Sequence, residues 1–117
     1  AISVWIEKTV SQRLPDVNPN DLAEAWRTLL HRARLSKHHR VTREELSVRA
    51  HMSSILRSLK ERRVAEFGEL FDPQRGVPVL VVTFLALLEL ARELLIEVTQ
   101  SAGFGPIYVK LAHAESA

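Results

Sequence analysis

Cysteine is missing from this sequence of 117 residues, and so are the motifs of the common enzyme classes. Without thiols the chain has no disulfide and no thiolate chemistry, which suits a reducing compartment such as the cytoplasm. It also has no glycine-rich phosphate loop, no nucleophile elbow and no catalytic triad pattern. Paired carboxylates occur at Glu44 and Glu45, but in a polar stretch without the apolar burial that raises a catalytic pKa. We therefore expect no enzyme activity, no cofactor and no small-molecule substrate.

A membrane-spanning run is also missing. The most apolar stretch, 78–88, is shorter than the roughly 20 residues that a bilayer requires, and no cleavage site follows it. The content of 46% hydrophobic and 26% charged residues is typical of a folded, soluble chain of one domain. The sequence begins with Ala1 rather than Met, so we expect a fragment of a longer protein.

Five histidines raise the question of a metal site. Zinc needs three or four ligands that converge in space. The histidines are spread over two expected helices, a connector and the tail, and no pair has i, i+4 spacing: His31, His38, His39, His51 and His113. We predict no metal site.

The formal net charge of +2 hides a strong asymmetry along the chain. Residues 25–63 hold eleven Lys or Arg and three Asp or Glu, whereas the remainder holds five and eleven. Such a basic block fits an acidic partner or weak, non-specific contact with DNA, and solvated helix faces fit it equally well. The candidate contact residues in this block are Arg27, Arg32, Arg34, Lys37, Arg40 and Arg43.

The first half of the chain predicts an arm, a helix and a connector. Residues 1–17 alternate weakly between apolar and polar side chains, which favours an extended arm. Asn18 is a good N-cap with Pro19 at the first helical position, and apolar spacing continues this helix to about Leu35. A polar, His-rich connector completes the segment 18–45.

The second half, 46–112, predicts a winged helix followed by a tail, 113–117. A short extended piece at 46–48 leads into a helix that is capped by Ser47 and ends near Arg62 or Arg63. A short strand at 64–65, a brief helix at 66–71 and a long helix from Pro78 to about Leu95 follow. Two alternating strands, IEVTQ and IYVKL, close the domain. The expected fold class is mainly α with a small β hairpin: a three-helix core plus a wing, preceded by an extra helix.

The helix after Pro78 is apolar on more than one side. One face carries Leu80, Phe84, Leu87, Ala91 and Leu94, and the opposite face carries Val79, Val82 and Ala86, with Leu85 at its flank. A domain of this size usually buries one stripe of each helix. Burial of the second face on a partner would contribute about 1.5–3 kcal/mol per large side chain. We predict that this face binds another protein.

Cations are absent where a DNA-reading winged helix needs them. The third helix has only Arg92, near its end, and the wing loop 101–106 has no Lys or Arg. Phosphate neutralisation is therefore missing from both reading elements, which disfavours sequence-specific recognition. A winged-helix transcriptional regulator remains the alternative hypothesis, and a module that pairs with its own copy is a third.

Several segments together resemble the C-terminal part of the ScpA family. They are REELSVRAHMSSIL, FGELFD, LVVTFLALLELA and FGPIYVKL, in this order, preceded by LPDVNPNDLAEAWRTLLHRARLSKHH. The resemblance covers about Leu14–Leu111 and departs at Ala50–His51, where the family usually has Arg–Glu. ScpA proteins are bacterial kleisins, non-catalytic subunits that close a ring between two SMC ATPase heads.

The resemblance implies a cytoplasmic, nucleoid-associated protein whose winged helix docks on an SMC head and whose preceding segment contacts a ScpB dimer. The basic block would then meet ScpB or DNA. Besides the second helix face, the wing hairpin is a candidate head contact, because a strand could pair with a sheet of the head. The candidate side chains on this hairpin are Phe104, Ile107, Tyr108 and Val109.

Overall fold

The structure, a computed structural model, describes residues 4, 8, 12–36, 41–101 and 105–112. The α-helices are α2 (Pro19–Arg34), α3 (Val48–Arg62) and α4 (Val77–Arg92). Short 3-10 helices are η1 (Glu44–Leu46), η2 (Phe67–Leu70) and η3 (Pro73–Arg75). The strands are β1 (Val64–Glu66), β2 (Ile96–Gln100) and β3 (Ile107–Leu111). This order confirms a mainly α fold with a small antiparallel sheet.

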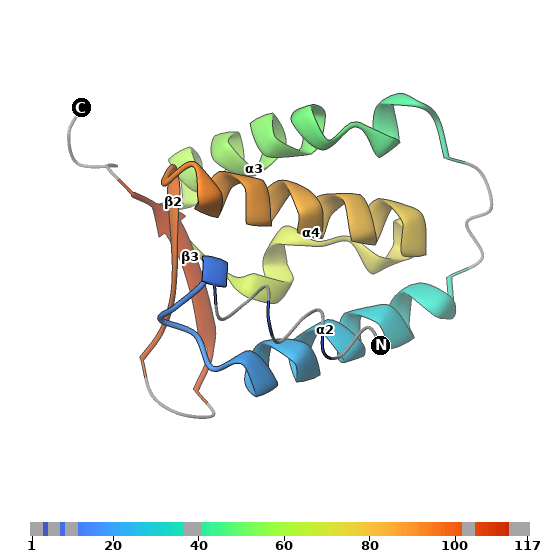
Figure 1. Cartoon of the computed structure of the whole chain (residues 1–117). Coiled ribbons are helices and arrows are strands. Elements are labelled where there is room, and N and C mark those ends of the chain that lie inside the picture. Colours follow the sequence, from blue (N-terminus) through green and yellow to red (C-terminus); the bar gives the residue numbers. More distant parts are fainter. Residues whose placement is uncertain (1–3, 5–7, 9–11, 37–40, 102–104, 113–117) are drawn as a thin grey trace.

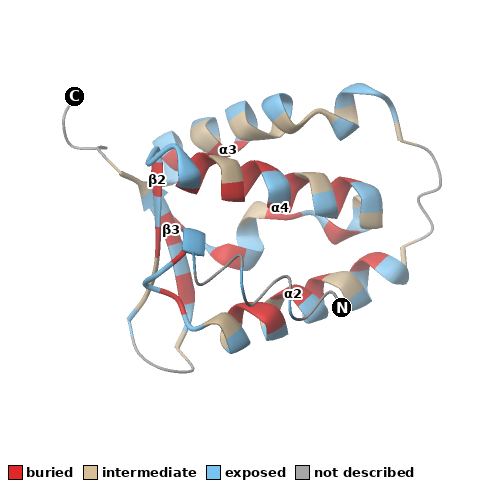
Figure 2. Ribbon diagram, viewed as in Figure 1, coloured by how far each residue is buried: buried red, intermediate tan, exposed pale blue. Residues whose placement is uncertain are grey.

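Helix α4 lies between the other two helices, with α3 on one side and α2 on the other, and the sheet closes one end of the layer (Figure 1). This central position follows from composition, because a helix that is apolar on several sides is stable only when neighbours cover them. Most of α4 is accordingly buried (Figure 2). The single hydrophobic core draws side chains from α2, α3, α4 and the sheet.

The sheet has the order β1-β3-β2, so the expected hairpin gains β1 as a third strand. Ala65 and Val98 both pair with Val109, and this row faces the core. Side chains alternate along a strand, so the next row, Glu66 and Thr99 on either side of Tyr108, points outward. The strand β3 is therefore the centre of the sheet.

Helix α2 begins where the sequence predicts. The Asn18 side-chain oxygen accepts hydrogen bonds from the Asn20 and Asp21 amides at 2.9 and 3.3 Å, which satisfies two free donors of the first turn. Trp26 stacks on Phe84 of α4 with ring centroids 4.6 Å apart. The extra helix thus shares its core with the winged helix.

The segment before α3 differs from its prediction. Residues 44–46 form a 3-10 turn rather than an extended piece. The Glu45 carboxylate accepts a hydrogen bond from the Thr42 amide at 2.8 Å, and the Thr42 hydroxyl accepts one from the Glu45 amide at 3.1 Å. These two hydrogen bonds close a turn, because the side chain of each residue accepts from the backbone amide of the other. Ser47 then caps α3 as predicted, accepting from the Ala50 amide at 3.1 Å.

The expected brief helix and the expected arm also need correction. Residues 66–71 contain only the 3-10 helix η2, which is closed by a reciprocal bond pair between Glu66 and Glu69. In the predicted arm, the described positions Val4 and Lys8 are helical, so an extended arm is wrong there. The reason is visible in the sequence, because apolar residues recur every four positions before Leu14, which suits a helix as well as a strand.

Helix α4 ends at Arg92, three residues before its predicted end. Leu94 has a positive φ of 62° and its amide donates to the Ala91 carbonyl, while the Leu95 amide donates to the Leu90 carbonyl. These two bonds form a Schellman turn that satisfies the last carbonyls of the helix. Leu94, which was expected to face the core, is consequently 72% exposed.

Candidate partner-binding surface

The predicted spare face of α4 is largely internal. Val79 is 2% exposed and Ala86 is fully buried, so the expectation that they face away from the domain is wrong. The physical reason is α3, which packs along this side of α4: Val79 lines a small cavity together with His51 and Ile55. Contact of Val79 or Ala86 with a partner would therefore require α3 to move.

An exposed apolar face of α4 does exist, rotated away from the predicted one. Val81 and Leu85 are 37% and 39% exposed, and Val82 between them is half-buried. We call these three residues the α4 stripe. Since they are spaced at three and four residues, they form one continuous strip along the helix. Of the predicted face, Val82 and the flanking Leu85 belong to this strip.

Charges border the α4 stripe at its C-terminal end. Arg92 forms an ion pair with Glu89, with its Nε donating to the carboxylate at 3.0 Å. This hydrogen bond lowers the pKa of Glu89 and raises the pKa of Arg92. Arg92 is the only cation on α4, and it is already neutralised by a carboxylate one turn away. The exposed side of α4 is thus apolar and electrically neutral.

A hollow of about 370 Å³ continues this surface toward α3. It is lined by the half-buried Val48 and Met52, by Arg49, and by Glu89 and Glu93 of α4. Apolar side chains on the floor and charges of both signs at the rim are typical of protein-binding surfaces. The α4 stripe and this hollow together form the candidate site.

On the sheet, the candidate hairpin residues divide into two groups. Tyr108 is 38% exposed on the outer face, whereas Ile107 and Val109 are buried in the core. Since β3 pairs with β1 on one side and β2 on the other, it cannot extend a partner's sheet, and that part of the prediction is wrong. Only β1 and β2 are edges among the described strands. Phe104 lies outside the described residues.

The basic candidates do not gather in one place. Arg27 and Arg34 are exposed and two turns apart on one flank of α2, while Arg32 lines a groove on the other flank. Arg43 lies in the connector, directly before η1. Lys37 and Arg40 lie outside the described residues. Contact of this block with DNA or another protein stays a prediction.

Among the histidines, His51 has a structural place. Its Nε2 donates to the Glu45 carbonyl at 2.7 Å, and its Nδ1 lies 3.4 Å from the Thr83 hydroxyl, which itself donates to the Val79 carbonyl. His51 thereby joins η1 to α4. Within the described residues no group of three His, Asp or Glu side chains could hold a metal ion. His38, His39 and His113 fall outside that part.

Sequence reasoning missed Val81, and a signal in the sequence could have found it. Glu89 and Arg92 must face solvent, because charged side chains are rarely buried. A line traced back from them by three or four residues leads to Leu85, Val82 and Val81. The charged end of α4 thus indicates the outward side of its apolar beginning.

Comparison with known proteins identifies the family. The family model described as Segregation and condensation protein ScpA matches residues 4–112. The chain belongs to the ScpA family. This confirms the resemblance that the sequence motifs indicate, and ScpA membership supports a role in chromosome segregation and condensation.

Two ScpA relatives illustrate the extent of the similarity. Segregation and condensation protein A of Xylella fastidiosa (strain 9a5c) is 41% identical over 104 residues, covering 89% of this chain and 34% of the relative. The protein of the same name from Listeria innocua serovar 6a is 43% identical over 99 residues, covering 81% of this chain and 39% of the relative. The chain thus spans little more than a third of these relatives. No solved structure matches it.

Proposed function

We propose that this chain is the head-docking part of a non-catalytic kleisin in a bacterial SMC–ScpAB complex, in the cytoplasm and at the nucleoid. Its winged helix docks on an SMC ATPase head and closes the ring, while ATP chemistry takes place in the head. A ScpB dimer contacts the segment before the winged helix. No helix within the described residues has the length and hydropathy needed to cross a membrane.

The observation that carries the proposal is the character of the α4 stripe. A winged helix that reads DNA presents polar and cationic side chains on this helix, because base edges and phosphates require them. Here the outward positions carry the exposed Val81 and Leu85 and the half-buried Val82, and the nearest cation is paired with Glu89. Such a face cannot form ion pairs with phosphate. Its burial against another protein is favourable, because apolar surface is removed from water.

The outer face of the sheet supplies a second contact. Tyr108 stands at the centre of an outward row between Glu66 and Thr99, and aromatic side chains of this kind are frequent hot spots of interfaces. A hot spot is typically worth about 2 kcal/mol or more, which corresponds to about a 30-fold change in affinity. We expect the α4 stripe and Tyr108 to include such positions.

The test measures binding of purified variants to an isolated SMC head by titration calorimetry. Leu85→Asp and Val82→Asp place a charge in the stripe, and Tyr108→Ala removes the ring. Each should weaken head binding by about 30-fold while circular dichroism remains that of the parent. Leu35→Asp, an equal change at an exposed position beyond the end of α2, is the matched control and should bind as the parent does.

Other outcomes would assign another function. Unchanged head binding by all three variants would remove this surface assignment. Salt-dependent binding to duplex DNA that Arg92→Glu abolishes would support the winged-helix regulator instead. Sedimentation that shows a concentration-dependent dimer, broken by Leu85→Asp, would indicate that the stripe pairs with its own copy.

A further inference from the structure

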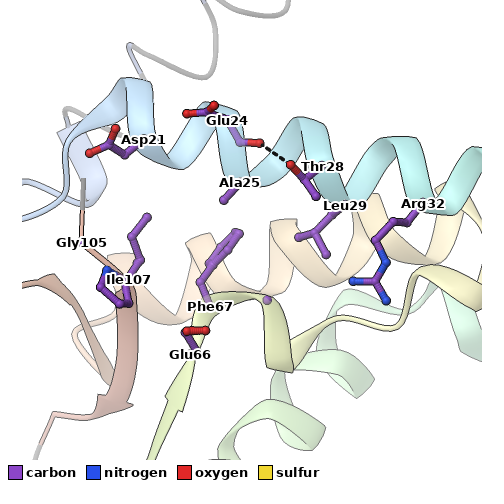
Figure 3. Close-up of a pocket in the computed structure, with 12 residues that line it drawn as sticks. Asp21, Glu24, Ala25, Thr28, Leu29, Arg32, Glu66, Phe67, Gly105 and Ile107 are labelled. Atoms are coloured by element: carbon purple, nitrogen blue, oxygen red, sulfur yellow. Dashed lines mark hydrogen bonds between the residues drawn. The ribbon is translucent and has the colours of Figure 1, made fainter. Parts of the chain in front are cut away.

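A hollow away from the α4 stripe lies between α2, η2 and the start of β3 (Figure 3). Its volume is about 660 Å³. The Phe67 ring points toward α2, where Leu29 faces it, and Ile107 closes one end (Figure 3). These three side chains belong to the hydrophobic core, so the floor of the groove is fixed by the fold itself.

The rim of this groove is acidic. Asp21 and Glu24 stand on α2, and Glu66 stands on the opposite side at the end of β1. Arg32 is the only cation among the lining residues. A chain whose formal net charge is +2 therefore presents a locally negative groove. Such a rim attracts cationic side chains and repels phosphate, which excludes nucleic acid as the occupant.

Part of one wall of the groove is formed by a glycine, Gly68. A Cβ atom built on Gly68 would meet nothing within 4 Å, so the space above this residue is open. Gly105 contributes backbone alone on the other side of the groove. The groove is consequently open above Gly68, which leaves room for the backbone of an extended segment.

We propose that this groove binds an extended, basic segment of a partner protein. An aliphatic side chain of the segment lies on the floor formed by Leu29, Phe67 and Ile107, and a Lys or Arg side chain beside it meets the exposed Glu24 carboxylate of the rim. The apolar contact supplies affinity and the charges select the partner. The groove shares no residue with the α4 stripe, so this inference does not depend on docking to an SMC head.

The experiment selects binders from a synthetic library of nine-residue peptides with the purified chain, followed by fluorescence anisotropy of the best sequence. We expect a consensus of Lys or Arg on both sides of an aliphatic residue. A Cβ atom has room at position 68, so the Gly68→Leu side chain can extend into the groove and should weaken binding of that peptide at least tenfold. Ala50→Leu, a similar enlargement at an exposed position of α3, is the matched control and should leave binding unchanged.

A second variant keeps the test decisive if Gly68→Leu folds poorly. Glu24→Lys reverses a charge on an exposed part of the rim, so it should weaken binding of the basic peptide at least tenfold. The proposal is overturned if the selected consensus is acidic or uncharged, or if Glu24→Lys leaves binding unchanged. The proposal is also overturned if the groove residues are protected from hydrogen exchange only when the chain dimerises, because the occupant of the groove is then a second copy of the chain.

Discussion

Replacement of Trp26 by alanine removes the largest side chain that joins α2 to the rest of the core. Trp26 is buried, stacks on Phe84 at 4.6 Å and meets the edge of Phe71 at 6.0 Å. A buried aromatic truncated to alanine costs about 3–5 kcal/mol, since transfer free energy and packing are both lost. The two ring contacts favour the upper part of that range.

This loss is large relative to the whole stability of the domain. Domains of this size have a free energy of unfolding of about 5–15 kcal/mol, and each kcal/mol lost lowers the melting temperature by roughly 4 °C. We therefore expect Trp26→Ala to melt about 15 °C below the parent in a thermal scan followed by circular dichroism. Trp26→Phe retains an aromatic ring on Phe84 and should lose less than half as much.

The reasoning is refuted if Trp26→Ala melts within about 3 °C of the parent. That result would mean that α2 is an appendage whose removal leaves the winged helix intact. Hydrogen exchange gives an independent measure: α2 amides should exchange no faster than those of α4 in the parent, and much faster in the variant. Equal exchange in both proteins would contradict the shared core.

Two further predictions concern the turns that bracket the helices. The hydrogen bond from the Thr42 amide, aided by Arg75, lowers the pKa of Glu45 to about 2. A lowered folded pKa stabilises the fold above the ordinary value of 4.5 and loses this effect as the pH falls toward 2. Urea unfolding should therefore show Glu45→Gln less stable than the parent at pH 7, with a difference that shrinks as the pH falls from 4.5 toward 2; a difference independent of pH would contradict this. Leu94→Gly should raise stability by roughly 1 kcal/mol in the same assay, because its φ of 62° strains a side chain that is mostly exposed, and a loss of stability would show that Leu94 has a packing role.

Much of the fold follows from local chemistry that is visible in the sequence. Asn18 before Pro19 and Ser47 before an apolar period both act as N-caps, because a side-chain oxygen next to free amides satisfies them. The strands 96–100 and 107–111 alternate with period two, and the structure has them at these bounds. What could not be predicted depends on tertiary contacts, such as the addition of β1 to the hairpin.

The candidate site was predicted less well, for a geometric reason. Choosing the outward side of α4 requires the position of α3, and an apolar helix gives no internal clue except at its charged end. The prediction included Val82 and the flanking Leu85 but placed the centre of the face at Val79 and Ala86, roughly a quarter of a turn away. A rotation of that size about the helix axis exchanges buried side chains for exposed ones, because consecutive residues of a helix point in directions about 100° apart.

Helix α2 links the proposed groove to the interior of the domain. Its Asp21, Glu24 and Leu29 form one side of the basic-peptide groove, while Trp26 on the adjoining side covers Phe84 of α4. A partner that pulled α2 from the core would therefore dismantle the groove and expose the interior side of α4 at once. Since both losses follow from one packing contact, the free energy that Trp26 contributes to folding also sets how firmly the groove is held in shape.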